Sequence, residues 1–339
     1  MRLPAEHAER LRPAFEGTNV CVTGGAGFIG SHLIDALFAL GAHITVIDDL
    51  STSKLSHLAP LIELDPARVR FVHGSILEDA ALHKAMTDAQ IVFHLAALSS
   101  VPRSIDDPER SFDVNATGTL RVVRAAASVG AHRLVFAGSS SAYGDTPELP
   151  KHEAMPPSPR SPYAAAKLAG EHLVMTWART STLDSAVLRF FNVFGPRQPA
   201  DSPYAGVVPR FAARLVAGKP PVIQGDGGQT RDFTYVENAV LALLLAGAHK
   251  DALDGQVFNV GGGERHSVAD LARIMAQELN PDAPPAEHAE PRAGDVRDSH
   301  ADLTRIADQL GYTPFVTFQE GVRLAAEWYR TPASTGDPQ

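Results

Sequence analysis

Tyr163 and Lys167 are the residues of this sequence whose types and spacing most directly suggest chemistry. They lie four residues apart in 161–180, which the sequence predicts to be a long helix with Ser161 as N-cap and Pro162 at its first position. Residues at this spacing share one helix face, so we expect the lysine ammonium beside the phenol. A neighbouring ammonium favours the phenolate, and we expect a lowered Tyr163 pKa and a general-base role. An ordinary surface Tyr–Lys pair is the alternative.

Three consecutive hydroxyls precede this helix in the sequence. Residues 133–137 (RLVFA) predict a buried strand that leads into Ser139, Ser140 and Ser141. Ligands of open α/β sheets bind at the carboxyl ends of the strands, which is where these hydroxyls are expected. A serine-rich turn that bonds only its own backbone is the other interpretation.

A glycine turn near the N-terminus predicts a dinucleotide site. The apolar run 20–22 meets Gly24, Gly27 and Gly30, and helical apolar spacing begins at Phe28. These glycines suit a tight turn, a close approach of the backbone to a pyrophosphate, and close packing of helix on strand. Asp48 ends the next strand, eighteen residues after Gly30, where an acid can bond ribose hydroxyls. With no Arg in 49–53, although Lys54 follows, the pattern favours NAD over NADP.

The rest of the chain supplies the elements that must position these residues. Alternating strands and helices predict an α/β fold, a parallel sheet with helices on both faces. The second half is broken by glycine and proline loops and predicts a smaller lobe over the carboxyl ends of the strands. Predicted strands lie at 20–22, 43–47, 70–73, 91–95, 133–137, 185–190 and 257–260, and predicted helices at 113–128, 161–180, 234–249, 268–279 and 318–329, with one more from Phe28.

We expect four parts in this order. Residues 1–18 form a helical extension outside the core fold, and residues 19–190 with 232–262 form the dinucleotide-binding domain. Residues 191–231 and 263–331 form the smaller lobe, and 332–339 are a tail.

Composition limits the function classes. The 339 residues are 44% hydrophobic and 20% charged, which is ordinary for a globular protein, and the net charge of −9 disfavours nucleic acid as a partner. The single cysteine, Cys21, excludes an internal disulfide and favours a reducing, cytoplasmic location. We find no apolar run of membrane-spanning length and no metal-ligand spacing among the fourteen histidines, so we expect neither a membrane nor a metal.

Eight stretches, in order along nearly the whole chain, resemble one family. They are TGGAGFIGSHL (23–33), HLAALSSVPRSIDDP (94–108), NATGTL (115–120), AGSSSAYGD (137–145), SPYAAAK (161–167), LRFFNVFGPRQ (188–198), GDGGQTRDFTYVEN (225–238) and RAGDVRDSHAD (292–302). The sequence is similar to the extended short-chain dehydrogenase/reductases, within the NAD-dependent sugar-nucleotide epimerase/dehydratase family. That resemblance implies a Rossmann domain with a small C-terminal substrate lobe. It also implies a homodimer through a four-helix interface that uses 113–128 and 161–180.

The resemblance also implies roles for individual residues. Tyr163 would be the general base, Lys167 its electrostatic partner, and Ser139 the hydroxyl that shares the proton, with Ser140 and Ser141 as rivals. Cofactor contacts would come from Gly24, Gly27, Phe28, Ile29, Gly30, Asp48, Ser75, Ile76, Leu95, Ala96, Ala97, Asn115, Tyr163 and Lys167. Substrate contacts would come from Ser99, Ser100, Ser139, Ser140, Ser141, Asn192, Val208, Arg231, Arg292, Asp295 and Ser299.

Within the substrate set, the resemblance assigns the diphosphate to Asn192 and Arg231, and a phosphate and the ribose to Arg292 and Asp295. Val208 would form part of the base-binding wall, and Ser299 would flank the sugar's C2 substituent. One position departs from the family pattern, since Gly74-Ser75-Ile76 has serine where an aspartate usually meets adenine. Serine carries no charge, which leaves Ile76 to pack on the ring.

The subgroup that the sequence most resembles is the UDP-N-acetylglucosamine 4-epimerases, which work through a 4-keto sugar and regenerate NAD in each turnover. A UDP-uronate epimerase or decarboxylase, or another NAD-dependent nucleotide-sugar oxidoreductase, is the alternative. A 4,6-dehydratase would need an Asp-Glu pair where Ser140-Ser141 stand. A non-catalytic NAD(P)-sensing protein need not keep Tyr163 and Lys167 together.

Overall fold

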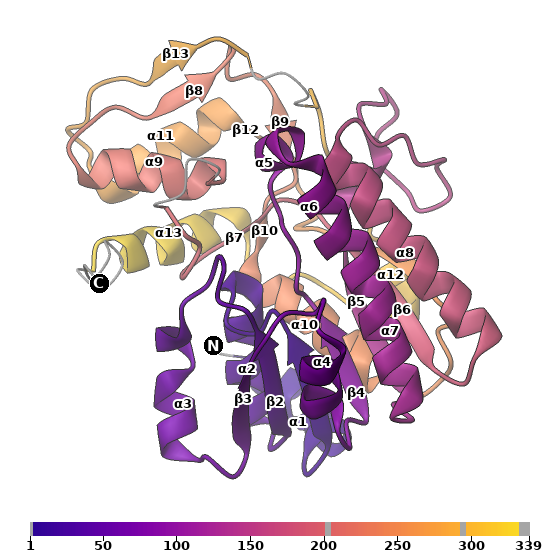
Figure 1. The fold of residues 1–339 in the computed structure, drawn as a ribbon. Coiled ribbons are helices and arrows are strands. Elements are labelled where there is room, and N and C mark those ends of the chain that lie inside the picture. The colour runs from indigo at the N-terminus through magenta and orange to yellow at the C-terminus, as the bar shows by residue number, and fades with distance from the viewer. Residues whose placement is uncertain (1–2, 201–204, 292–295, 332–339) are drawn as a thin grey trace.

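The computed structural model describes residues 3–200, 205–291 and 296–331. Within these residues a seven-stranded sheet forms the centre, with strand order β11-β6-β5-β4-β1-β2-β3 and every neighbouring pair parallel (Figure 1). Its strands are β1 (Asn19–Thr23), β2 (His43–Asp48), β3 (Val69–His73), β4 (Ile91–His94), β5 (Arg133–Ser139), β6 (Asp184–Phe190) and β11 (Gln256–Val260). This is the Rossmann-type α/β fold that the sequence predicts.

Two apolar cores cover the two faces of the sheet. Alternate residues of a strand point to opposite faces, and β1 shows this directly, because Val20 and Val22 enter one core while Cys21 enters the other. The first core packs α1 (Ala5–Phe15), α2 (Phe28–Ala39), α10 (Val236–Ala248) and α12 (Thr304–Leu310). The second packs α4 (Asp79–Met86), α7 (Gly118–Ser128) and α8 (Pro162–Thr180).

The segments between the strands and these helices contain short helices. They are η1 (Leu55–His57), α3 (Ala59–Leu64), α5 (Val101–Asp106), α6 (Pro108–Phe112), η2 (Asp113–Thr117) and η3 (Ser140–Tyr143). The predicted helix over 113–128 is therefore η2, a π-helical turn, continued by α7. The predicted N-cap of α8 is confirmed, because the Ser161 side chain accepts a hydrogen bond from the Ala164 amide.

A smaller part of the chain follows the carboxyl ends of β6 and β11, and Figure 1 shows it beyond one end of the sheet. Its apolar cluster lies among α9 (Val207–Val216), α11 (Val268–Leu279) and α13 (Phe318–Tyr329). In the described residues, three two-stranded sheets border it. They are β7 (Val193–Phe194) with β10 (Thr234–Tyr235), β9 (Thr230–Arg231) with β12 (His266–Ser267), and β8 (Val222–Gln224) with β13 (Glu287–Ala289).

The N-terminal helix α1 corrects one expectation. We expected residues 1–18 to lie outside the core fold, but Leu11 and Phe15 are only 2% and 0% exposed. The Phe15 ring lies 6.4 Å from the ring of Phe93 in β4. Many other residues of the segment are polar, so the sequence alone predicts a helix outside the core and does not reveal that these two apolar residues are buried.

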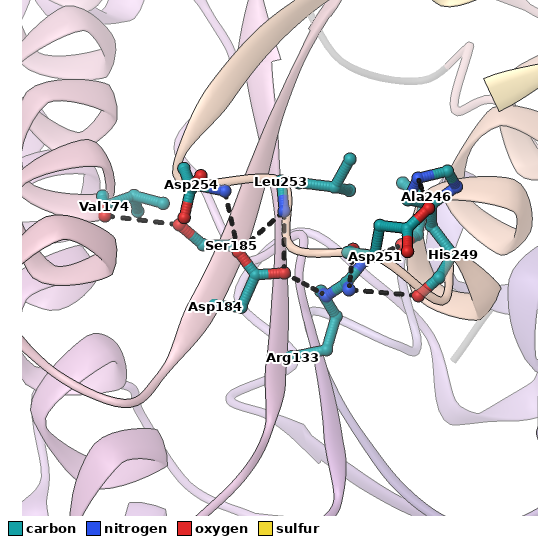
Figure 2. Close-up of polar contacts among 9 residues, drawn as sticks. All are labelled: Arg133, Val174, Asp184, Ser185, Ala246, His249, Asp251, Leu253 and Asp254. Atoms are coloured by element: carbon teal, nitrogen blue, oxygen red, sulfur yellow. Dashed lines mark hydrogen bonds and ion pairs between the residues drawn. The ribbon is translucent and has the colours of Figure 1, made fainter. Parts of the chain in front are cut away.

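At the end of the sheet where β5 and β6 begin, an ion pair joins the two strands (Figure 2). Arg133 Nε lies 2.8 Å from Asp184 Oδ2 in a buried setting. The same guanidinium donates to the carbonyls of Ala246, His249 and Asp251, and Asp184 accepts from the amides of Leu253 and Asp254. The ion pair joins β5 to β6, and the other bonds tie these strands to the end of α10 and the loop after it, so this cluster is structural.

Among the described residues, none of the helices combines the length and the apolar character that a membrane crossing requires. The same residues contain no group of three or more His, Cys, Asp or Glu side chains placed to hold a metal ion.

Candidate active site

The glycine turn between β1 and α2 has the geometry of a dinucleotide cradle. Gly24 adopts a φ of +70°, and a Cβ there would lie 2.6 Å from the Ala96 amide nitrogen. A Cβ on Gly30 would lie 2.3 Å from the Gly24 carbonyl oxygen, so the helix packs on the turn as only glycine permits. A Cβ on Gly27 would meet only that carbonyl, at 3.2 Å, so space beside this backbone is open to a phosphate.

Asp48 lies where an acid for the ribose is needed. Its side chain is 8% exposed at the end of β2. One carboxylate oxygen accepts from the Ala26 amide at 3.0 Å, and the other accepts from the Leu50 amide at 2.9 Å and the Ser53 hydroxyl at 2.7 Å. These bonds fix the carboxylate beside the glycine turn, and the residues present therefore fit NAD.

Residues Leu95, Ala96 and Ala97 form the start of the loop after β4. A buried network of polar side chains holds this loop in place. The Thr119 hydroxyl uses its one hydrogen to donate to the Asn115 carbonyl, so it can only accept from His94 Nε2. The proton of the neutral His94 ring is therefore on Nε2, and Nδ1 accepts from the Thr23 hydroxyl. Thr23 in turn accepts from the Ala96 amide at 3.3 Å. Burial holds the pKa of His94 well below its usual range, with a further contribution from the Lys167 charge, and this agrees with a neutral ring.

Asn115, an expected cofactor contact, belongs to the same network. It is fully buried, and its amide pairs with the backbone of Leu98, accepting from the amide at 3.1 Å and donating to the carbonyl at 3.2 Å. In this structure it therefore holds the β4 loop in place.

Tyr163 and Lys167 share one face of α8, as predicted, but their electrostatics correct the expectation. Lys167 is 4% exposed, its Nζ lies 4.1 Å from the centre of the Phe136 ring, and it makes no hydrogen bond to the described residues. Burial raises the pKa of Tyr163, and a side-chain hydrogen bond with Ser139 offsets this only in part. The predicted lowering is therefore wrong for this structure, because burial outweighs the effect of the Ser139 hydroxyl. Burial also lowers the pKa of Lys167 itself, to about 7.

The serine run lies beside this pair at the end of β5. Ser139 is the last residue of the strand, and its hydroxyl lies 2.8 Å from the Ser141 hydroxyl and accepts from the Ser141 amide. Ser139 is also the serine that lowers the pKa of Tyr163, against the larger effect of burial. The structure therefore brings Ser139, Tyr163 and Lys167 together, with Ser140 and Ser141 in the short helix that follows.

The expected diphosphate residues lie near one buried carboxylate that the sequence did not single out. Asp232 is fully buried, and it accepts from the amides of Gly262 at 2.6 Å and Ala301 at 3.1 Å. Asn192 donates to the Asp232 carbonyl at 3.3 Å, and Arg231 precedes Asp232 in the chain. Asp232 therefore joins the segments that contain the two residues.

Ser299 lies on a segment tied to β9. It is 7% exposed, and its amide donates to the Thr230 carbonyl at 3.1 Å. It is therefore a buried residue rather than an exposed loop serine.

The remaining expected contacts differ in their surroundings. Val208 is 2% exposed within the cluster around α9, and Ile76 is 5% exposed and packs where a Gly118 Cβ would stand. Ser100 caps α5 by accepting from the Arg103 amide, Ser75 accepts from the Leu77 amide, and Ser99 is exposed. Arg292 and Asp295 lie outside the described residues, as does the tail 332–339.

This geometry agrees with comparisons with known proteins. Residues 20–261 match the NAD dependent epimerase/dehydratase family. The chain belongs to this family. It is 40% identical over 313 residues to the "UDP-glucose 4-epimerase" of Mycolicibacterium smegmatis, covering 91% of this chain and 97% of that protein.

Two solved structures are also similar. A UDP-N-acetylglucosamine 4-epimerase from Methanobrevibacter ruminantium, in complex with UDP-N-acetylmuramic acid, has a TM-score of 0.86 and 36% identity over 93% of this chain and 98% of its own. The Thermus thermophilus UDP-glucose 4-epimerase in complex with NAD has a TM-score of 0.83 and 35% identity over 93% of this chain and 100% of its own. NAD is accordingly the cofactor of this family member.

Two carboxylates escaped the sequence analysis although a signal was present. Glu171 lies four residues after Lys167 and so shares its helix face, and Asp232 stands next to Arg231 in a stretch that already resembled the family. Neither was singled out, because burial of a carboxylate is not visible in the sequence.

Proposed function

We propose that this protein is a UDP-sugar 4-epimerase that interconverts UDP-N-acetylglucosamine and UDP-N-acetylgalactosamine. The observation that carries the proposal is the meeting of three groups at the end of β5: the Ser139 hydroxyl, the Tyr163 phenol whose pKa that hydroxyl lowers, and the buried Lys167 ammonium one helical turn from Tyr163. A phenolate beside a hydroxyl can accept the proton of a sugar alcohol and becomes a phenol in doing so. The 4-epimerase names of similar proteins support the reaction type.

In the proposed mechanism, Ser139 and Tyr163 hold the 4-hydroxyl, and the Tyr163 oxygen takes its proton. NAD, when bound, supplies the acceptor for the C4 hydride and returns it. Lys167 contributes positive charge, which stabilises the phenolate while the proton is on its way to or from the sugar. Asn192 and Arg231 bind the diphosphate, and the 4-keto sugar turns between them and Tyr163 before the proton returns to the other epimer.

Ser299 supports the N-acetyl assignment. A small side chain at this buried position leaves room for a C2 substituent, whereas a tyrosine would fill it. Ser299→Tyr should suppress turnover of the UDP-N-acetylhexosamines and spare UDP-glucose and UDP-galactose. The measurement is kcat/KM for both substrate pairs in the parent and the variant. An equal loss for both pairs, or no loss, would remove Ser299 as the determinant.

The direct test of the activity is incubation of the purified protein with UDP-N-acetylhexosamines, UDP-hexoses and UDP-uronates, followed by chromatography of the products. The proposal expects the N-acetyl epimers to interconvert with the highest kcat/KM. Conversion of UDP-uronates alone would replace the proposal with a uronate epimerase or decarboxylase. An absence of turnover with every UDP-sugar would contradict it.

We also propose a homodimer through the outer faces of α7 and α8. An apolar groove of about 500 Å³ is lined by α8 on one side and by α6, η2 and the start of α7 on the other, and Phe112 of α6 is 53% exposed. Its lining is Phe112, Ala116, Thr117, Leu120, Ala169, His172, Leu173 and Thr176. Helices that leave such a face uncovered are suited to packing against a second copy. Sedimentation velocity should give a dimer for the parent and a monomer for Leu173→Glu, and a monomeric parent at micromolar concentration would refute the assembly.

A further inference from the structure

One face of α8 continues past the Tyr163–Lys167 pair. Tyr163, Lys167 and Glu171 are spaced four residues apart, so they lie in a row along the helix. Lys167 is 4% and Glu171 is 2% exposed. A carboxylate this deeply buried must be paired, and the proposed function leaves it without a role.

Arg189 of β6 is the partner of Glu171. Its Nε lies 3.0 Å from one carboxylate oxygen and its second nitrogen 2.6 Å from the other, and both side chains are 3% exposed. This bidentate geometry fixes the plane of the carboxylate. The Arg189 guanidinium is stacked in turn over the Tyr143 ring at 4.6 Å, and the Tyr143 phenol donates to Asn259 at 2.6 Å. The carboxylate is therefore held from behind by a rigid chain of contacts.

Among the described residues around Lys167, Glu171 is the one that supplies a negative charge. Tyr163 and Glu171 come from α8, and His94, whose pKa is well below its usual range, comes from β4. Asn115 and Thr119 from η2 and α7 pack against α8 at Gly170, and the Phe136 ring comes from β5. Arg189 of β6 stands beyond Glu171 and neutralises part of its field.

We propose that Glu171 and Arg189 are a positioning pair for Lys167, in which Arg189 fixes a carboxylate one helical turn behind the ammonium and that carboxylate keeps Lys167 charged in its buried site. The inference rests on the proposed function, which gives Lys167 its role. The balance of effects on the lysine agrees with it. Burial lowers the pKa of Lys167 to about 7, and Glu171 is the neighbour that raises it. Without the carboxylate, burial would act unopposed.

The test follows the Lys167 titration itself, which needs no turnover. Protein labelled with ¹³C at lysine Cε is titrated by NMR, and Lys167→Met identifies the signal. We expect Glu171→Gln to lower the Lys167 pKa by roughly one unit, and Arg189→Gln to raise it, because an unneutralised carboxylate acts more strongly on the lysine. The basic limb of the kcat profile should move in the same two directions. Glu320→Gln is the matched control, since it breaks a bidentate Glu–Arg pair on the exposed face of α13.

Opposite shifts in the two variants support the positioning pair. An unchanged Lys167 titration in Glu171→Gln, or shifts of the same sign in both variants, would overturn it and leave a structural ion pair. Removing one member of a buried ion pair leaves the other charge unpaired and destabilises a protein strongly. If a single variant does not fold, the double variant Glu171→Leu/Arg189→Met, which removes both charges, is used in its place. It should show the lowered Lys167 pKa, and an unchanged pKa would overturn the inference. A parent without epimerase activity but with the two opposite shifts would refute the proposed function alone.

Discussion

Gly30→Ala sets two opposing effects against each other, and the structure decides between them. Gly30 lies in α2, where alanine favours the helix by about 1 kcal/mol. The added Cβ, however, would lie 2.3 Å from the Gly24 carbonyl oxygen and 2.7 Å from the Gly25 Cα. Both are backbone atoms, so turn and helix must separate by roughly 1 Å to restore ordinary contact distances of about 3.5 Å. Overpacking of this kind costs about 1–3 kcal/mol, so we expect a net loss of stability of about 1 kcal/mol.

The larger effect should be on the cofactor. The same displacement moves the amides of the turn that face the pyrophosphate, so we expect NAD affinity to fall by at least about tenfold, or about 1.4 kcal/mol. Urea denaturation measures the first quantity, and calorimetric titration of the apoprotein with NAD measures the second. The matched control is Gly130→Ala, where a Cβ meets nothing within 4 Å. Its φ of +75° strains any alanine, but NAD affinity should not change. Parent-like NAD binding in Gly30→Ala would refute the cradle geometry.

Three further predictions concern the chemistry and the carboxylates. Tyr163→Phe should reduce kcat by about 10²–10⁴-fold while cofactor content and the unfolding midpoint stay near parental values, and activity within a few-fold of the parent would reject the general-base role. Because Asp48 is fixed beside the turn, the apoprotein should bind NAD more tightly than NADP, and the reverse order in a titration would contradict its assignment. Burial raises the pKa of Asp232 from its usual 3.8 to about 6, against the lowering effect of the Ala301 and Gly262 amides. The folded state therefore holds this proton more tightly than the unfolded state, and Asp232 removes stability as the pH rises from about 4 through 6. The free energy of unfolding of the parent relative to Asp232→Asn should fall by about 3 kcal/mol over that range, and a difference that does not vary with pH would show that Asp232 does not titrate there.

The sequence anticipated most of the sheet, because each strand is an apolar run closed by a turn and each major helix has apolar periodicity. Ser161 also identified the start of α8 correctly. What it could not anticipate depends on burial. Leu11 and Phe15 looked like surface residues among charges, yet they pack on the sheet. The phenol of Tyr163 lies in a setting that raises its pKa, although spacing alone suggested that the lysine would dominate.

The site divides in the same way. The glycine turn, Asp48, Tyr163 and Lys167 could be found from local spacing, because each belongs to a motif within one or two elements. Asp232 binds the amides of Gly262 and Ala301, which are 30 or more residues away in the chain. Arg189 pairs with Glu171, which is 18 residues away. Such pairings depend on the folded arrangement, and a single sequence does not reveal them. The amide of Asn115 likewise turned out to hold the β4 loop.

The most direct test of the account is the fate of hydrogen at C4. UDP-N-acetylglucosamine carrying deuterium at C4 is incubated with the purified protein in ordinary water, and the UDP-N-acetylgalactosamine formed is analysed by mass spectrometry and NMR. We predict that the product retains deuterium at C4, because the hydride leaves and returns within one site that holds NAD. Product with hydrogen from water at C4, or no product, would contradict epimerisation of this nucleotide sugar through transient oxidation.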